Sequence, residues 1–268
     1  MSILCHKIKR ANITGPNSSN RHQSVMDSLP REITDEIIDN LPLSGLRSSS
    51  LVAKQWRKRS QQRVFQRIRF VFEPGVKTWH MNTREDPDRI PSYVQSANFY
   101  SIKKWSDSAL FSNVLENFSS LNQLGIHGIE ITDEMAESIQ SGRFGEGVTT
   151  LHVWSPICSI STVISMILSL PNLQRLFIEN KGNMSGEAPP TYHATSRREP
   201  LTMLTLHGDV GEAVKALAES HFVSRRLSLS LDAETLSTRQ FLVLSSEILN
   251  KLTIGGVQPW YILRDPKK

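Results

Sequence analysis

Histidine and glutamate side chains follow several short apolar segments of the sequence, and these residue types bind metal ions and transfer protons. The set comprises His127, His152, Glu179 and His207. In the strand register derived below, His127 and His207 lie three strands apart, roughly 14 Å at about 4.8 Å per strand, too far for one ion with bonds near ~2.1 Å. The nearer trio of His127, His152 and Glu179 leaves a metal site open as a minor alternative, and we expect neither a metal nor another cofactor.

Motifs for other catalytic chemistry are incomplete. The glycine-rich segment at 141–147 has neither the strand, G-x-G-x-x-G, helix order of a dinucleotide loop nor the Lys-Ser/Thr of a P-loop. The GNMSGE segment misses the G-x-S-x-G pattern by one position, and neither Cys5 nor Cys158 has a spaced histidine partner. We therefore predict a protein that is not an enzyme.

An apolar pattern of the form L-x-x-L-x-L recurs eight times from Phe65 onward, with Ser224 replacing one of its apolar residues. Its central positions are Ile68, Ala97, Leu124, Leu151, Leu176, Leu204, Leu227 and Leu252, and the residue two places later is again apolar. The intervals between central positions range from 23 to 29 residues. The pattern resembles the leucine-rich repeat, whose period is about 20 to 29 residues.

Segments with helical periodicity lie between these strands, at residues 106–118, 132–140, 161–170 and 208–220. Strands that alternate with helices at so short a period predict an α/β fold, a solenoid with parallel strands on one face and helices on the other. We assign residues 67–268 to this leucine-rich-repeat-like solenoid. The Gly-, Pro- and Ser-rich segment 181–199 is predicted to be a surface loop, either an insertion without a task or a ligand-capturing element.

Side chains alternate along a strand, so the residues that flank each apolar pair face away from the core. We expect the target-binding residues among them: Tyr100, His127, His152, Trp154, Phe177, Glu179 and His207. Aromatic residues are enriched in binding hot spots. The alternative is a set of exposed aromatic side chains that a loop or the tail covers.

The first quarter of the chain has a different pattern. Residues 1–26 are rich in Gly, Pro, Asn and Ser without apolar periodicity, which predicts a flexible leader. Residues 27–66 predict three short helices, the first capped by Asp27 or Ser28 and ended by Pro42. In the first helix, apolar residues recur at four-residue spacing as Ile33, Ile37 and Leu41, and Ile38 widens this apolar stripe. A second short helix starts near Ser44, and the third is indicated by Leu51, Val52 and Trp56.

The segment from Leu29 to Ile68 resembles an F-box. It has a leading Leu-Pro, an acid and an isoleucine just after it, a second Leu-Pro about a dozen residues later, an apolar pair and a tryptophan. The matching positions are Leu29, Pro30, Glu32, Ile33, Ile37, Leu41, Pro42, Leu46, Leu51, Val52, Trp56 and Arg57. One departure is Ala53, where many members have cysteine, and this change keeps a small side chain.

The resemblance implies that the module docks onto the Skp-type adaptor of an SCF ubiquitin ligase and, through the adaptor, onto cullin. The implied adaptor-binding residues are Leu29, Pro30, Ile33, Ile37, Leu41, Pro42, Leu46, Leu51, Val52 and Trp56. A small helical unit buries little apolar surface on its own, so a partner would complete it. The chain would then be a substrate-recognition subunit with an unknown target protein. The alternative is an F-box scaffold that acts outside ubiquitin ligation.

The charge balance argues against a nucleic-acid binder, because 31 Lys and Arg residues face 26 Asp and Glu residues and the net charge is only +5. The basic run at 54–69 is either a solvated helix face or a surface that steers the module toward an acidic adaptor. Two cysteines and the absence of a long apolar stretch predict a cytoplasmic or nuclear protein without a membrane span.

Overall fold

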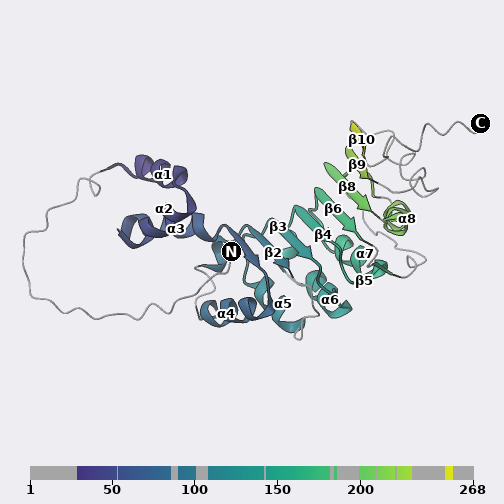
Figure 1. Cartoon of the computed structure of the whole chain (residues 1–268), viewed down its shortest axis with the longest axis horizontal. Helices are drawn as coiled ribbons and strands as arrows, with labels where there is room; N and C mark the ends of the chain where they lie inside the picture. The colour runs from purple at the N-terminus through teal and green to yellow at the C-terminus, as the bar shows by residue number, and fades with distance from the viewer. Residues whose placement is uncertain are drawn as a thin grey trace, which may run out of the picture. The chain divides into compact units, whose positions relative to one another are not determined.

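The chain divides at Arg67 into two units, Met1–Arg67 and Ile68–Lys268. The computed structural model describes residues 29–52, 54–85, 90–100, 108–141, 143–181, 184–185, 199–208, 210–220, 222–230 and 251–255. Within these ranges the fold is α/β, with eight α-helices and a sheet of parallel strands (Figure 1). No helix in these ranges has the length and apolar character that crossing a membrane requires. The predicted leader lies outside the described residues, as does most of the predicted loop at 181–199.

The first unit contains three helices: α1 (Arg31–Asn40), α2 (Leu43–Val52) and α3 (Lys54–Phe65). Its core is small. The buried apolar side chains of this core are Ile38, Leu46 and Trp56, and Leu41 and Val64 pack against them while partly buried. The hydroxyl groups of Ser49 and Ser60 form a buried hydrogen bond between α2 and α3 at 2.7 Å.

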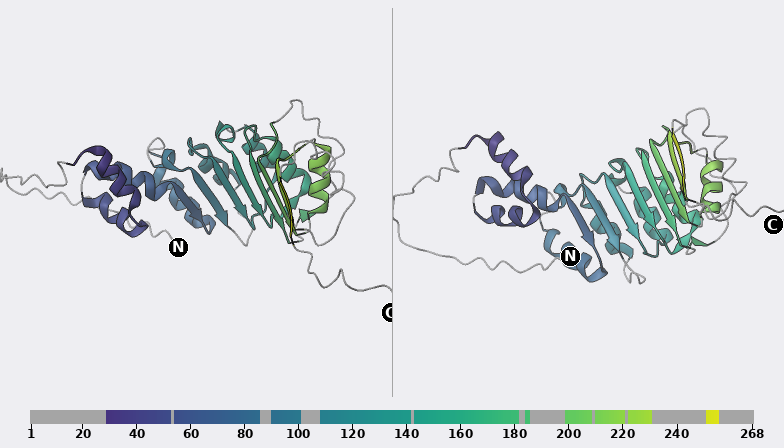
Figure 2. Two further views of the ribbon diagram at one scale, coloured as in Figure 1. Left: turned by 90° about the horizontal axis from the view of Figure 1, so that it is seen from above. Right: turned by 45° about the horizontal axis from the view of Figure 1, so that its top comes forward.

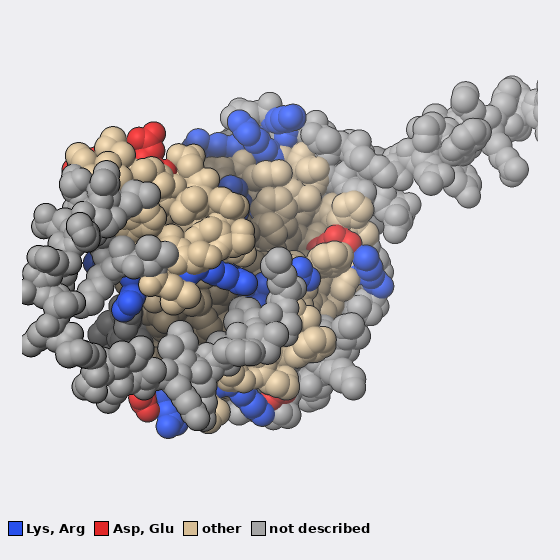
Figure 3. All heavy atoms as spheres, turned by 60° about the vertical axis from the view of Figure 1, so that its left-hand side comes forward, with Lys and Arg blue, Asp and Glu red and all other residues tan. Residues whose placement is uncertain are grey.

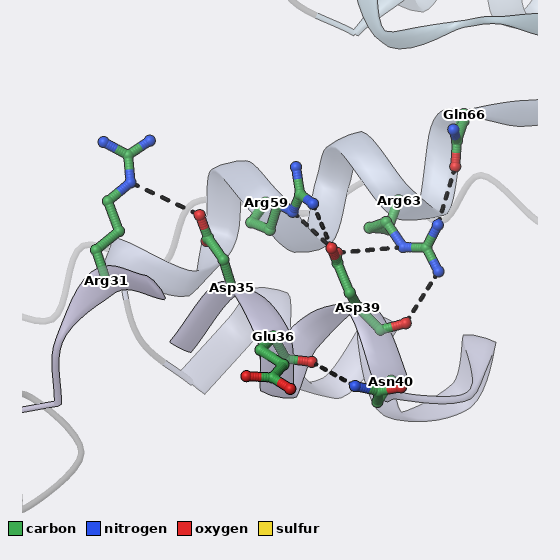
Figure 4. A network of polar contacts seen from close by, with 8 residues as sticks. All are labelled: Arg31, Asp35, Glu36, Asp39, Asn40, Arg59, Arg63 and Gln66. Atoms are coloured by element: carbon green, nitrogen blue, oxygen red, sulfur yellow. Dashed lines mark hydrogen bonds and ion pairs between the residues drawn. The ribbon is translucent and has the colours of Figure 1, made fainter. Parts of the chain in front are cut away.

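An ion-pair network ties α1 to α3 (Figure 4). The guanidinium of Arg59 donates to both carboxylate oxygens of Asp39, with Nε at 2.9 Å from Oδ1. Arg63 lies against the same residue, because its Nε is 3.5 Å from Oδ1 of Asp39 and it also donates to the Asp39 backbone carbonyl at 3.0 Å. The Arg59 hydrogen bond lowers the pKa of Asp39, so this carboxylate stays ionised at neutral pH. Part of the basic run therefore serves the internal packing of the unit.

The second unit is built on an eight-stranded sheet in the order β1-β2-β3-β4-β6-β8-β9-β10. Its strands are β1 (Arg67–Phe70), β2 (Ser96–Tyr100), β3 (Gln123–His127), β4 (Thr150–Trp154), β6 (Arg175–Asn180), β8 (Met203–Gly208), β9 (Arg226–Ser230) and β10 (Lys251–Gly255). All pairs from β2 to β10 are parallel. A separate parallel pair joins β5 (Cys158–Ser159) to β7 (Met184–Ser185). The predicted central positions from Ala97 to Leu252 pair with one another in one row, which confirms the predicted strand register.

Five helices follow one another along one face of this sheet, as Figures 1 and 2 show. They are α4 (Glu73–Thr83), α5 (Ser108–Glu116), α6 (Asp133–Ser141), α7 (Ile160–Leu168) and α8 (Gly211–Glu219), with short 3-10 turns at Pro91–Tyr93 and Arg143–Glu146. The apolar pairs of the strands, such as Leu124 and Ile126, are fully buried toward these helices. At the first strands the core is aromatic, since the Phe99 ring lies 5.0 Å from Phe70 and 4.9 Å from Phe111.

Several predicted details of the helices were wrong. α1 begins at Arg31, with Pro30 as its N-cap and no side-chain capping bond, whereas Asp27 or Ser28 was predicted to cap it. Of the predicted apolar stripe, Ile38 is buried together with Thr34, while Ile33 and Ile37 are exposed. α2 extends from Leu43 through Val52, so Leu51 and Val52 end the second helix and do not begin the third.

The helices at 106–118, 132–140, 161–170 and 208–220 were predicted and are present, while α4 was not predicted. The buried Ser224 occupies an apolar position of the repeat, where its hydroxyl donates to the carbonyl of Arg226 at 2.8 Å.

Candidate functional site

The face of the sheet opposite α4–α8, called the open face here, carries all seven predicted target-binding side chains. Tyr100, His127, Trp154, Glu179 and His207 form one row across β2, β3, β4, β6 and β8, and His152 pairs with Phe177 in the row before it. Trp154 and His207 are exposed, and the others are half-buried. The structure therefore brings together residues from five separate segments of the chain.

Stacked rings link neighbouring strands in this row. The rings of Tyr100 and His127 are nearly parallel, with centroids 4.1 Å apart, and the His127 ring meets the Trp154 ring at 5.4 Å in an edge contact. The guanidinium of Arg69 lies 3.9 Å from the Tyr100 centroid, and the Lys181 ammonium lies 5.2 Å from that of Trp154. We call these five residues the ring ladder. It consists of three aromatic rings with a cation at each end.

Gly125 makes room for this arrangement. It lies on β3 between Asn98 and His152 of the adjacent strands. The Nε2 atom of His127 lies 3.4 Å from Oδ1 of Asn98 across the position where a side chain at Gly125 would stand. A Cβ atom there would come within 2.9 Å of both Asn98 Cγ and His127 Nε2, and closer still to Asn98 Oδ1. A larger residue at this position would therefore force the Asn98 and His127 side chains to shift.

Gly125→Ala is expected to lower the free energy of unfolding of the second unit by about 1–3 kcal/mol, because the new methyl group overpacks the site. Asn98→Ala in the same chain should restore part of the loss, since it removes the nearest obstacle. Gly75→Ala is the matched control, because nothing lies within 4 Å of its Cβ position. Urea unfolding would measure all three. Equal effects of the Gly125 and Gly75 variants would contradict the packing account.

The two central histidines are neutral at physiological pH. Burial lowers the pKa of His127 to about 4, and nearby His152 and Arg69 act in the same direction. Burial, followed by the charge of Arg175, also lowers the pKa of His152. The Nδ1 atom of His127 is buried and has no hydrogen-bond partner among the described residues. Protonation of His127 would therefore place a charge in a poorly solvated position beside Arg69.

The stability of the second unit should consequently fall in mild acid. His127 has a pKa of 6.5 in the unfolded chain and about 4 in the folded one, so the unfolded state binds more protons between these values. This residue alone should lower the free energy of unfolding by about 2–3 kcal/mol between about pH 7.5 and pH 4.5. His127→Phe keeps a ring on Tyr100 and should remove that part of the pH dependence in urea unfolding. Identical pH profiles for the two proteins would contradict this.

A row of basic side chains on the open face was missed by the sequence analysis. Arg175, Arg226 and Lys251 are exposed and lie at the amino ends of β6, β9 and β10, two residues before Phe177, Ser228 and Thr253. Arg175 bonds to the Thr150 hydroxyl of the adjacent strand at 3.0 Å, which places its side chain on the same face. These residues occupy the next position on the open face toward the start of each strand, so extending the alternation by two residues would have identified them.

The first unit offers a different surface, made of exposed apolar residues. Ile33 and Ile37 on α1 are 45% and 38% exposed, and Leu43 and Leu51 on α2 are 42% and 73% exposed. We call these four residues the α1–α2 apolar surface. Pro30 and Pro42 are also exposed, whereas Leu29 and Leu41 are half-buried. Large exposed aliphatic side chains in such a small unit are typical of an interface.

Not every predicted adaptor-binding residue lies at that surface. Leu46 and Trp56 belong to the core of the unit together with Ile38, so their side chains hold the helices together. Val52 ends α2, and its side chain lies outside what the structure describes. Leu43 was not among the predicted residues, although its place directly after Pro42 could have drawn attention to it.

Neither a metal centre nor a reactive thiol stands out in the described part of the chain. No three His, Cys, Asp or Glu side chains in those ranges converge enough to hold an ion. Burial raises the pKa of the Cys158 thiol to about 12, with a smaller contribution from Asp133, so this thiol stays protonated.

The chain matches no protein-family model and no curated protein. The function proposed below is therefore based on the residues of the open face and of the α1–α2 apolar surface.

Proposed function

We propose that the chain is a substrate-recognition subunit of an SCF-type ubiquitin ligase. In this proposal the three-helix unit is an F-box that binds a Skp-type adaptor, and the adaptor links it to cullin. The second unit is a leucine-rich-repeat-like solenoid whose open face binds the target protein. The subunit itself carries out no chemistry. It raises the effective concentration of target lysines at a ubiquitin-conjugating enzyme.

The observation that supports the first half is the mismatch between core and surface in the three-helix unit. Among the described side chains of this unit, the buried apolar ones are Ile38, Leu46 and Trp56, while Ile33, Ile37, Leu43 and Leu51 are exposed. Burial of each aliphatic side chain on a partner contributes roughly 1.5–3 kcal/mol. Docking would therefore stabilise the unit substantially, which agrees with the resemblance of Leu29–Ile68 to an F-box.

The regular register of the sheet supports the second half. Seven consecutive strands pair in parallel through equivalent residues of the repeat, from Ala97 to Leu252. Such stacks present a continuous surface of side chains from many repeats. The ring ladder supplies the aromatic and cationic residues that dominate protein interfaces.

Affinity capture of the tagged full-length protein from cells tests this proposal. We expect the native chain to retain a Skp-type adaptor and cullin, and a variant with Leu29→Ala and Pro30→Ala to retain much less of both. Unchanged recovery of the adaptor by the variant would contradict the F-box assignment. Recovery of the adaptor without cullin and without ubiquitylated clients would instead indicate a scaffold outside ubiquitin ligation.

A further inference from the structure

The open face has a strong excess of positive charge. Among the described residues that the second unit places on this face, Arg69, Arg175, Lys181, Arg226 and Lys251 are basic, and Glu179 is the one acidic residue. Glu179 is already partnered, because its carboxylate lies 3.6 Å from the Lys181 ammonium. Five positive charges and one negative charge leave an excess of four, so this face would attract an anionic partner.

Two rings of this face, those of Tyr100 and His127, are placed with their edges outward. Tyr100 and His127 stand on adjacent strands and stack face to face at 4.1 Å, so the normals of the rings point from strand to strand. The edges of both rings must then face the solvent. Aromatic edges carry partial positive charge, whereas aromatic faces carry partial negative charge. The rings of Tyr100 and His127 therefore add to the positive character of the open face.

The same geometry argues against a single-stranded nucleic acid. Such ligands stack their bases on free aromatic faces. Here the Tyr100 faces contact Arg69 and His127, while Lys181 lies over Trp154 and Phe177 packs on His152 at 4.2 Å. In the view of Figure 3, Lys and Arg side chains stand in several separate groups among uncharged residues.

We propose that the open face binds an extended, acidic peptide segment of the target protein. The inference rests on the proposed role of the second unit in target binding and names the chemistry of the target. From β1 to β10 the sheet has seven strand intervals, or about 34 Å, which about ten extended residues would span. The carboxylates meet Arg175, Arg226 and Lys251, and the chain continues across the ring ladder. The leader does not supply this segment, since residues 1–26 contain four Lys or Arg and no Asp or Glu.

The test is fluorescence anisotropy with the full-length protein and a labelled peptide of about ten residues in which Glu alternates with Ser. A second peptide has Gln in place of Glu, and a single-stranded oligothymidine of equal charge is the third probe. We expect the Glu peptide to bind at least about tenfold more tightly than the Gln peptide and to weaken as salt rises. Equal binding of the two peptides, or preference for the oligonucleotide, would overturn the proposal.

Variants locate the binding to the open face. Arg175→Ser with Arg226→Ser should raise the Kd of the Glu peptide about three- to thirtyfold, because two exposed charge contacts are lost. Lys215→Ser is the matched control, since Lys215 lies on α8 on the other side of the sheet, and it should leave the Kd unchanged. Equal loss in both variants would overturn the assignment to this face. Adaptor capture and peptide binding are measured separately, so failure of one leaves the other interpretable.

Discussion

Phe99→Ala is expected to lower the free energy of unfolding of the second unit by about 3–5 kcal/mol. The Phe99 ring is fully buried and lies between Phe70 and Phe111, with centroids 5.0 Å and 4.9 Å away. Truncation would leave a cavity between β1, β2 and α5, and those aromatic neighbours cannot collapse into it without breaking their own contacts. Urea unfolding followed by circular dichroism would measure the loss.

Phe72→Ala is the control for that experiment, because the Phe72 side chain is 63% exposed. Its removal should change stability by less than about 0.5–1 kcal/mol. If Phe99→Ala and Phe72→Ala unfolded at the same urea concentration, Phe99 would not lie in a packed core. The described arrangement of the first strands and helices would then be wrong.

Ile33→Asp with Ile37→Asp is expected to weaken binding of a Skp-type adaptor by about a hundredfold or more. Two isoleucines buried at an interface contribute roughly 3–6 kcal/mol together. Every loss of about 1.4 kcal/mol in binding free energy raises Kd tenfold. The new carboxylates would also have to lose water on binding. Both side chains are exposed and lie outside the core of Ile38, Leu46 and Trp56, so the unit itself should stay folded.

Binding of purified full-length variants to immobilised adaptor would measure this effect, with thermal unfolding as the check on folding. Met81→Asp is the matched control, because Met81 is a 66% exposed apolar residue on α4 of the second unit. The Met81 variant should bind as the native chain does. Native affinity in the Ile33 and Ile37 double variant would remove α1 from the interface.

The strand register was predictable because each strand carries the same apolar pair. Leu124 with Ile126 and Leu151 with Val153 mark the buried side and the place of pairing, and a slip of one residue would expose all of them. The ring ladder followed from the same alternation. Lys181 did not, because it lies directly after β6. Arg175, which is not part of the ladder, was also missed, because it lies two residues before Phe177 at the start of the same strand.

The side of α1 that packs inward could not be read from apolar spacing alone. Ile33 and Ile37 are spaced by four residues, but so are Thr34 and Ile38, and the structure buries the second pair. Asp39, which follows Ile38 in α1, pairs with Arg59 and Arg63 of α3 on the inward-facing side of the helix. This pairing joins residues that are 20 or more positions apart in the sequence. The spacing of apolar residues within one helix gives no information about such a contact.

Helix α4 was missed for a local reason. It contains Pro74 and Gly75 in its first turn, and both residues usually mark turns. Proline is nevertheless common in the first turn of a helix, because the N–H groups there have no intrahelical acceptor and proline loses no hydrogen bond. The buried Val76, Trp79 and Thr83 follow helical spacing and could have identified this helix.

Isothermal titration of a purified Skp-type adaptor into the full-length chain tests the central claim most directly, namely that the α1–α2 apolar surface is buried by a second protein. We predict one-to-one binding with a negative heat-capacity change, the mark of apolar burial, and a smaller change for Ile33→Asp with Ile37→Asp. Absence of binding, or an unchanged heat capacity in the double variant, would contradict the account.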